Sequence, residues 1–167
     1  QKIFFCKDIS FYFNLQIHNP KSQIIFVIIM KKILLLSDTH GLIDEKIINY
    51  ANSADEIWHA GDIGDISITD KLKNFAHLRA VWGNIDNNQI RGEFSETICF
   101  TCEAIKVIIT HIGGYPGKYN KRILNGLKEY KPDLFICGHS HILKIIYDKK
   151  HDFLHINPGA IGKHGFH

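Results

Sequence analysis

The sequence predicts an α/β fold in which two mixed β-sheets pack together and are flanked by helices. Three observations predict it. Strand-like and helical segments alternate after Met30, two hairpin-like strand pairs follow in the second half, and 167 residues with 45% hydrophobic content suffice for one core. The alternation indicates a largely parallel sheet covered by helices, and the hairpins indicate a second sheet packed on the first. We therefore expect a single domain.

The first half of this domain is expected to run strand, helix, strand, helix and strand. The expected strands are residues 32–36, 55–59 and 78–82, and the expected helices are residues 44–53 and 67–76. In the first helix, apolar side chains recur at helical spacing, at Ile43, Ile47, Ile48 and Ala51. Asp44 and Glu45 suit its N-terminus because the helix dipole favours negative charge there. Ser67 or Thr69 is expected to cap the second helix.

The second half contains the hairpins. Strands are expected at residues 93–102 and 104–110, followed by the glycine-rich loop HIGGYPGKY, a helix at residues 120–130 and a strand at residues 133–137. Residues 144–148 and 153–156 have the pattern of an antiparallel pair. These strands are the ones we assign to the second sheet.

Residues 1–29 differ in composition from the rest of the chain. They hold five of the eleven phenylalanines, one acidic residue and no glycine. The only methionine, Met30, stands directly before KKILLLSDTHG, which has the form of a natural start. We expect residues 1–29 to be translated upstream sequence or a non-native extension. The competing interpretation is a genuine N-terminal arm that adds a strand or a helix.

The charge distribution does not favour a nucleic-acid or membrane partner. The formal net charge is +3, and the basic residues are scattered rather than clustered. The longest apolar run before the lysines, residues 24–30, is far shorter than the ~20 residues needed to cross a bilayer. Four cysteines are few for this length, so a reducing cytoplasm is the expected compartment.

Cys99 and Cys102 form a C-x-x-C spacing, which raises the question of redox or zinc chemistry. No second pair follows them, and the segment around them alternates like a hairpin. Two packed strand cysteines are therefore the favoured interpretation over a zinc or redox site.

Five strand-like runs each end in a short polar cluster. The clusters contain Asp38 and His40, Asp62, Asn84 and Asp86, His111, and His139 and His141. In open α/β sheets the carboxyl ends of the strands line the ligand crevice, so the five clusters are expected to converge. Taken singly, each residue is usually a turn or cap residue. Together, nitrogen and oxygen donors of this kind suit Mn, Fe, Zn, Co or Ni rather than Ca or Mg.

The order D-x-H, GD, GN-x-D, H and GH-x-H resembles the signature of the calcineurin-like metallophosphoesterases. The SDTHG opening and the NPG near the end are similar to their small bacterial and archaeal phosphodiesterase branch. The resemblance runs from about Met30 to Gly159. It implies a four-layer α/β/β/α sandwich formed by residues 30–167. It also implies that the domain is C-terminally truncated, because family members continue with roughly one more strand or hairpin.

The resemblance also implies the roles of the site residues. One metal ion would be held by Asp38, His40, Asp62 and His141, and the second by Asp62, Asn84, His111 and His139. Asp62 would therefore bridge two divalent transition-metal ions, with Mn first and Fe, Zn, Ni or Co as alternatives. Catalysis would depend on Asp62, Asn84, Asp86 and His111, and a metal-activated hydroxide would hydrolyse a small phosphate ester. Asp86 is expected to orient a ligand such as a histidine N–H.

Ile85 departs from the family pattern, because many members carry at this position a histidine proposed as the general acid. An apolar side chain cannot donate a proton, so we expect phosphodiester or activated aryl-phosphate hydrolysis over alkyl monoesters. His59 is expected to pack rather than to bind metal, and Asn157 to steady a ligand.

Two other classes of protein are the alternatives to an enzyme. The first is a non-catalytic scaffold or binding protein of the retromer type on the same fold, although every expected ligand position here holds a competent residue. The second is a nucleotide-binding protein without metals. That class needs a phosphate loop such as G-x-G-x-x-G, whereas SDTHGLID has one glycine. Related small enzymes often self-associate, so a homo-oligomer is a further expectation.

Overall fold

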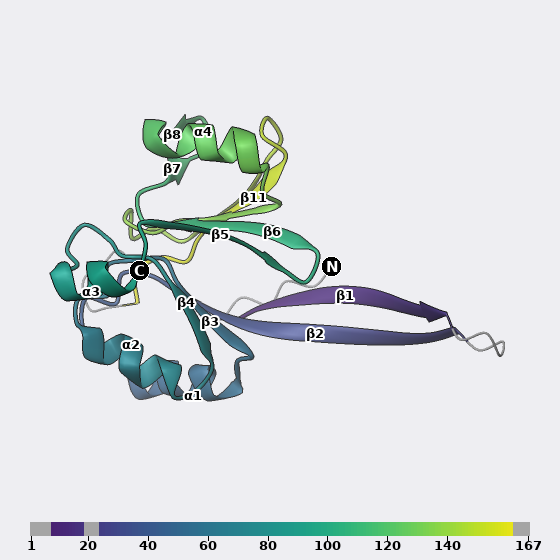
Figure 1. Cartoon of the computed structure of the whole chain (residues 1–167), viewed down its shortest axis with the longest axis horizontal. Helices are drawn as coiled ribbons and strands as arrows, with labels where there is room; N and C mark the ends of the chain where they lie inside the picture. The colour runs from purple at the N-terminus through teal and green to yellow at the C-terminus, as the bar shows by residue number, and fades with distance from the viewer. Residues whose placement is uncertain (1–7, 19–23, 162–167) are drawn as a thin grey trace.

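A computed structural model describes residues 8–18 and 24–161, and it describes side chains from residue 31 to residue 161. In its first part, β1 (Asp8–His18) pairs antiparallel with β2 (Ile24–Leu36). Figure 1 shows this hairpin reaching well beyond the body of the molecule. The expectation that residues 1–29 are an extension lies in part outside the described residues, and it stays a prediction.

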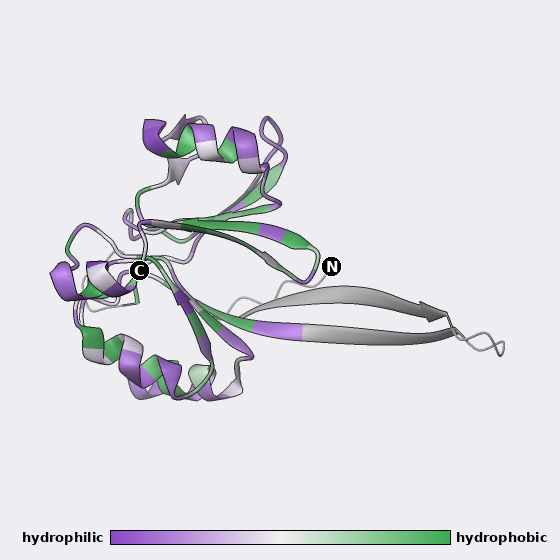
Figure 2. Ribbon diagram, viewed as in Figure 1, coloured by the Kyte–Doolittle hydropathy of each residue, from purple (hydrophilic) through white to green (hydrophobic). Residues whose placement is uncertain are grey.

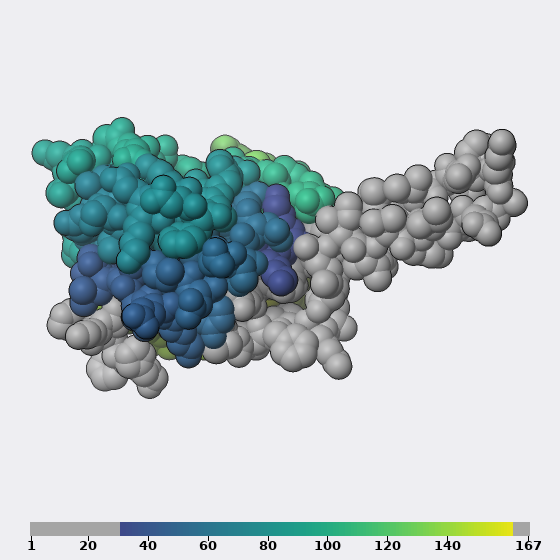
Figure 3. Space-filling model, turned by 90° about the horizontal axis from the view of Figure 1, so that it is seen from below, coloured from purple at the N-terminus to yellow at the C-terminus, as the bar shows by residue number. Residues whose placement is uncertain are grey.

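The first sheet has the strand order β1-β2-β3-β4. Strands β3 (Glu56–His59) and β4 (His77–Ala80) run parallel to β2. They are connected through α1 (Glu45–Ser53) and α2 (Ile66–Lys73), as the alternating pattern predicted. Figure 3, which looks at the molecule from below, shows the layer formed by these helices.

The second sheet has the order β10-β11-β9-β6-β5. Its strands are β5 (Thr97–Cys102), β6 (Ile105–Thr110), β9 (Leu134–Ile136), β10 (Lys144–Asp148) and β11 (Phe153–Asn157). The central strands β6, β9 and β11 are parallel, and β5 and β10 add antiparallel edges. The glycine-rich loop contains the short pair β7 (Gly114–Tyr115) and β8 (Lys118–Tyr119), and α4 (Lys121–Tyr130) follows it.

The two sheets pack face to face, with helices on both outer sides (Figure 1), so the expected four-layer sandwich is confirmed. Consecutive residues of β2 show how the layers are held together. Ile33 and Leu35 enter the core between the two sheets, while Leu34 and Leu36 enter the core under α1 and α2. A strand buried on both faces needs a continuous apolar run, which is why KKILLL lacks alternation. In Figure 2 the end of β2 that lies within the body of the molecule is green, at the hydrophobic end of the scale.

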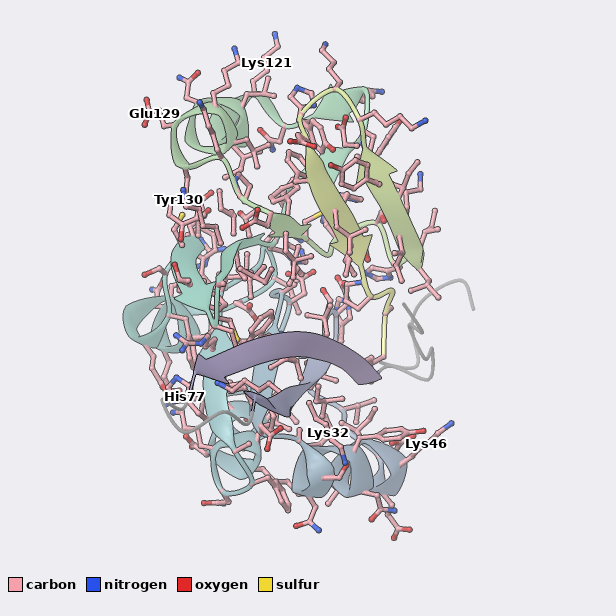
Figure 4. All side chains as sticks on the ribbon, turned by 90° about the vertical axis from the view of Figure 1, so that its right-hand side faces the viewer. Lys32, Lys46, His77, Lys121, Glu129 and Tyr130 are labelled. Atoms are coloured by element: carbon pink, nitrogen blue, oxygen red, sulfur yellow. The ribbon has the colours of Figure 1, made fainter. Side chains whose placement is uncertain are left out.

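The outer helices turn polar side chains to solvent. In Figure 4, Lys46 on α1 and Lys121 on α4 point away from the body on opposite sides of the molecule. The longest helix in the described part of the chain has ten residues, and none of these helices is long and apolar enough to cross a bilayer.

Two local predictions were wrong. The cap of α2 is Asp65, whose carboxylate accepts a hydrogen bond from the Ser67 backbone N–H at 2.8 Å, and not Ser67 or Thr69. The strand expected to begin at residue 93 begins at Thr97, because the helix α3 (Asn88–Glu93) lies before it. This helix is only six residues long, too short to show a helical period in the sequence.

His155 is buried in the third core, between the second sheet and α4. Its ring lies among aromatic side chains, 5.7 Å from Phe135 and 6.0 Å from Tyr119 between centroids. Its Nδ1 has no hydrogen-bond partner among the described residues. Burial, assisted by the positive charge of Lys144, lowers the pKa of His155 to about 4. The ring is therefore neutral in the folded protein at pH values where an unfolded chain would protonate it.

This burial predicts a pH-dependent stability. Between pH 6.5 and pH 5 the unfolded histidine takes up a proton that the folded one does not, so the free energy of unfolding falls by about 1.5 kcal/mol as the pH is lowered over this range. His155→Phe removes this contribution. The free energy of unfolding of both proteins is measured with urea at the two pH values. On going from the higher to the lower pH, the variant is expected to become more stable relative to the wild type by about that amount. A difference between variant and wild type that does not change with pH would contradict the prediction.

Candidate metal centre

The predicted site residues come together where the parallel strands of both sheets end. Each follows a strand at its carboxyl end: β2, β3 and β4 of the first sheet, and β6 and β9 of the second. The ligand atoms of Asp38, His40, Asp62 and His141 lie within 4.8 Å of one another, and so do those of Asp62, His111 and His139. Asp62 belongs to both groups. The two groups match the ligand sets implied by the family resemblance, apart from Asn84.

The first group is a set of electron-pair donors that face one another. Nε2 of His141 lies 3.2 Å from Asp38 Oδ1 and 3.3 Å from His40 Nε2. Asp38 Oδ1 is fully buried and has no hydrogen-bond partner among the described residues. The other oxygen of the same carboxylate accepts from the Ser37 hydroxyl at 2.6 Å. A buried carboxylate oxygen left without a donor is costly, so this geometry fits a bound cation.

The second group is arranged around His111. Its Nδ1 lies 2.8 Å from the carbonyl oxygen of Ala60 and must donate to it, which leaves the lone pair on Nε2. That nitrogen faces Asp62 Oδ1 at 3.2 Å and Asn84 Oδ1 at 3.1 Å. Oxygen acceptors on both sides of Nε2 favour a positive charge there, either a proton on the ring or a bound cation. The amide oxygen of Asn84 thus lies beside the second group.

The pKa values of this pair show the same requirement. Burial alone lowers the pKa of His111, but the neighbouring Asp62 carboxylate outweighs burial and raises it. Burial likewise opposes ionisation of Asp62, and hydrogen bonds from His111 and from the Ile85 backbone N–H lower its pKa overall. Asp62 is thus held as a carboxylate, which is the form that binds metal ions.

Backbone strain is concentrated on the ligands. Eight non-glycine residues in the described part of the chain have positive φ, and five are predicted ligands: Asp38, His40, Asp62, His139 and His141. Their φ values lie between 48° and 68°. Such a conformation costs about 1 to 3 kcal/mol per residue and persists where the surrounding structure enforces it, typically at functional sites.

Two glycines allow the ligand loops to approach one another. A Cβ at Gly83 would lie 2.1 Å from Asp62 Oδ1, and a Cβ at Gly138 would lie 1.9 Å from Ser37 Oγ. Ser37 is the residue that donates to the Asp38 carboxylate. These positions therefore require glycine because of close packing against the first-sheet loops.

His59 is buried and is not a ligand, as expected. Its Nδ1 accepts from the Gly61 backbone N–H at 3.2 Å, so in the neutral ring Nε2 carries the proton and donates to Thr39 Oγ1 at 3.0 Å. The Thr39 hydroxyl in turn donates to Ile63 O at 3.0 Å. Burial lowers the pKa of His59 to about 3, which keeps the ring neutral. His59 thus links the loop that carries Asp38 and His40 to the loop that carries Asp62.

The expected role of Asp86 is corrected. Its carboxylate does not orient a histidine. It accepts from the backbone N–H of Gly83 at 2.7 Å and of Gly64 at 2.8 Å, and so supports the turn that presents Asn84. Sequence reasoning missed a second support, Arg91 of α3. Its guanidinium donates to the carbonyl oxygens of Asp86 at 2.7 Å and Asn84 at 3.1 Å, and it stacks on the Trp82 ring.

Asn157 lies under the other ligand turn. Its Nδ2 donates to Gly138 O at 2.7 Å and to Ser140 Oγ at 3.0 Å, and its Oδ1 accepts from the Gly159 N–H at 2.9 Å. It supports the turn that carries His139 and His141 rather than a single ligand. Asn157 was expected to steady a ligand. It lies beside the predicted ligands, but its hydrogen bonds are to the turn that carries them.

Cys99 and Cys102 do not form a metal or redox site. Cys102 is buried in the core between the sheets, whereas Cys99 is exposed. Residues three apart on one strand point to opposite faces. The interpretation as two packed cysteines is confirmed for Cys102 and wrong for Cys99.

The fold and the site define a class of protein: an α/β/β/α sandwich with two adjoining groups of carboxylate and imidazole donors at its strand ends. The family model described as "Calcineurin-like phosphoesterase superfamily domain" matches residues 30–167. A protein of Mycoplasma pneumoniae described as "Probable metallophosphoesterase" is 31% identical over 137 residues, which cover 79% of this chain and 80% of that protein. The chain belongs to the calcineurin-like phosphoesterase superfamily.

Solved structures support the fold. Vps29 of Entamoeba histolytica complexed with Zn²⁺ has a TM-score of 0.62 at 20% identity, covering 77% of this chain and 73% of that chain. A structure described as a novel archaeal phosphodiesterase has a TM-score of 0.60 at 24% identity, covering 77% of this chain and 83% of that chain. At these identities the likeness concerns the fold alone.

Proposed function

We propose that this chain is a metal-dependent phosphodiesterase that holds two divalent transition-metal ions. One ion would be held by Asp38, His40, Asp62 and His141, and the other by Asp62, Asn84, His111 and His139. The observation that carries the proposal is the sharing of Asp62 between two groups whose ligand atoms lie within 4.8 Å. Manganese is the first candidate, with Fe, Zn, Ni and Co as alternatives, because the donors mix imidazole nitrogen with carboxylate and amide oxygen.

The charge of the site favours an anionic substrate. The ligand set contains two carboxylates, Asp38 and Asp62, while the imidazoles and the Asn84 amide are neutral as ligands. When bound, two divalent cations would supply Lewis-acid stabilisation of the phosphoryl charge and an activated water. The loaded site would then carry a net positive charge that attracts a phosphate ester. A small phosphate diester is the substrate class proposed here.

The protein's own residues would keep the ligands oriented. The Ala60 carbonyl holds the His111 ring so that Nε2 faces Asp62 and Asn84. The Ile85 N–H donates to Asp62 Oδ1 at 3.1 Å and fixes the shared carboxylate. Ligands that are already oriented need little reorganisation during the reaction. In the net reaction, water forms a new P–O bond, the bond to the leaving alcohol breaks, and one proton of the water ends on that alcohol or in solvent.

The proposal is tested by metal analysis coupled to activity. We expect protein purified and incubated with Mn²⁺ to bind two ions per chain and to hydrolyse bis(4-nitrophenyl) phosphate. Removal of metal with a chelator is expected to reduce turnover at least about 10³-fold, and re-addition of Mn²⁺ to restore it. Two bound ions without hydrolysis of any ester would instead favour a binding protein on the same fold, and turnover that survives complete metal removal would also contradict the proposal.

A further inference from the structure

Exposed apolar side chains gather on the loops that carry the proposed ligands. Eight large apolar side chains in the described part of the chain are exposed, and five of them follow a ligand by one or two residues. Their exposed fractions range from 41% for Ile112 to 61% for Leu143. We call these five residues the apolar rim: Leu42, Ile85, Ile112, Ile142 and Leu143.

Each rim residue lies close to a proposed ligand along the chain. Consecutive Cα atoms are 3.8 Å apart, so each rim Cα lies within roughly 8 Å of the Cα of a ligand. The rim residues come from four different loops, and the ligand atoms of those loops converge at the centre. Exposed apolar side chains that gather on loops around one polar centre commonly mark a binding site. The ligand loops therefore combine a polar centre with an apolar border.

Ile85 is the best anchored member of the rim. Its backbone N–H donates to Asp62 Oδ1 at 3.1 Å, and the turn around it is held by Asp86 and Arg91. Its side chain nevertheless remains 47% exposed. A well-ordered turn thus presents an apolar side chain to solvent one residue from a proposed ligand. Because the core does not use this side chain, it is free to contact a bound molecule.

This inference rests on the function proposed above. We propose that the site selects phosphodiesters whose retained ester arm, the arm that does not leave, carries an apolar or aromatic group. The phosphate would occupy the polar centre, the retained arm would lie on Leu42, Ile142 and Leu143, and Ile85 would face the leaving group. Burial of about 100 Å² of apolar surface there stabilises binding enough for a tenfold or larger preference. A cationic or nucleoside arm would lose its hydration against the rim without gaining a polar partner.

The test uses three diesters that share one leaving group, 4-nitrophenolate, and differ only in the retained arm. The arms are phenyl, choline and the 5′-thymidyl group. With Mn²⁺-loaded protein, kcat/KM is expected to be at least about tenfold higher for the phenyl arm than for either polar arm. Equal values for the three esters would overturn the inference while leaving the proposed phosphodiesterase intact. Failure to hydrolyse any of the three would overturn both.

Rim variants identify the surface responsible. Leu42→Ser and Leu143→Ser are each expected to lower the ratio of kcat/KM for phenyl over choline by about three- to tenfold, with bound Mn²⁺ measured in parallel. Ile146→Ser, a comparably exposed position on β10 outside the rim, is the matched control and should keep the wild-type ratio. Rim variants with wild-type ratios would overturn the inference. If those variants instead dissociated a dimer seen by sedimentation, the rim would be a surface for a second copy.

Discussion

Asp62→Asn is expected to lower the turnover of bis(4-nitrophenyl) phosphate by about 10³-fold or more. Asp62 is the one residue shared by the two ligand groups, and its side chain is buried beneath them. Asparagine keeps the shape of the side chain but removes the negative charge that would lie between two cations. Bound Mn²⁺ should fall from two ions per chain to one or none, as measured by elemental analysis of the purified variant.

Asp65→Asn is the matched control for this change. Asp65 is exposed and caps α2 three residues further along the chain, and asparagine caps helices about as well as aspartate. This variant should retain two ions and wild-type turnover. An Asp62→Asn protein that kept both ions and full activity would exclude Asp62 as a shared ligand.

The second large effect concerns the leaving group. We expect turnover to fall by about 10² to 10⁴ when an aryl leaving group is replaced by an alkyl one, because Ile85 cannot donate a proton to the departing oxygen. The Ile85 side chain is exposed one residue from Asn84, at the position where many family members carry a histidine. Mn²⁺-loaded protein should hydrolyse bis(4-nitrophenyl) phosphate and 4-nitrophenyl phosphate faster than an alkyl phosphate. Equal rates on all three would contradict this.

Ile85→His sharpens the same test. An imidazole at this position has a pKa near the operating pH and can serve as the missing acid. The variant is expected to raise turnover of the alkyl ester and to change turnover of the aryl esters little. The ratio of aryl to alkyl turnover should therefore fall by about tenfold or more. An unchanged ratio of aryl to alkyl turnover would mean that the leaving oxygen lies elsewhere in the site.

The chemistry of the centre could be predicted from the sequence because it depends on residue type and order. Asp38, His40, Asp62, His111 and the pair of histidines after β9 each follow an apolar strand, and parallel strands end at one edge of a sheet. Their supports could not be predicted. Arg91 and Asp86 act on a turn through the backbone, and hydrogen bonds to backbone atoms impose no recognisable spacing on the sequence.

The sequence by itself determined most of the strands and helices, though not α3 or the short pair β7 and β8, since burial on one or two faces imposes periodic or continuous apolar runs. It also determined the set of donor side chains. Only the tertiary structure decided that five predicted ligands take left-handed backbone conformations and that His59 links two of the loops that carry them. These features arise from tertiary packing, both of neighbouring loops within the first sheet and of one sheet on the other. That packing brings together residues up to about a hundred positions apart, for which local sequence patterns carry no signal.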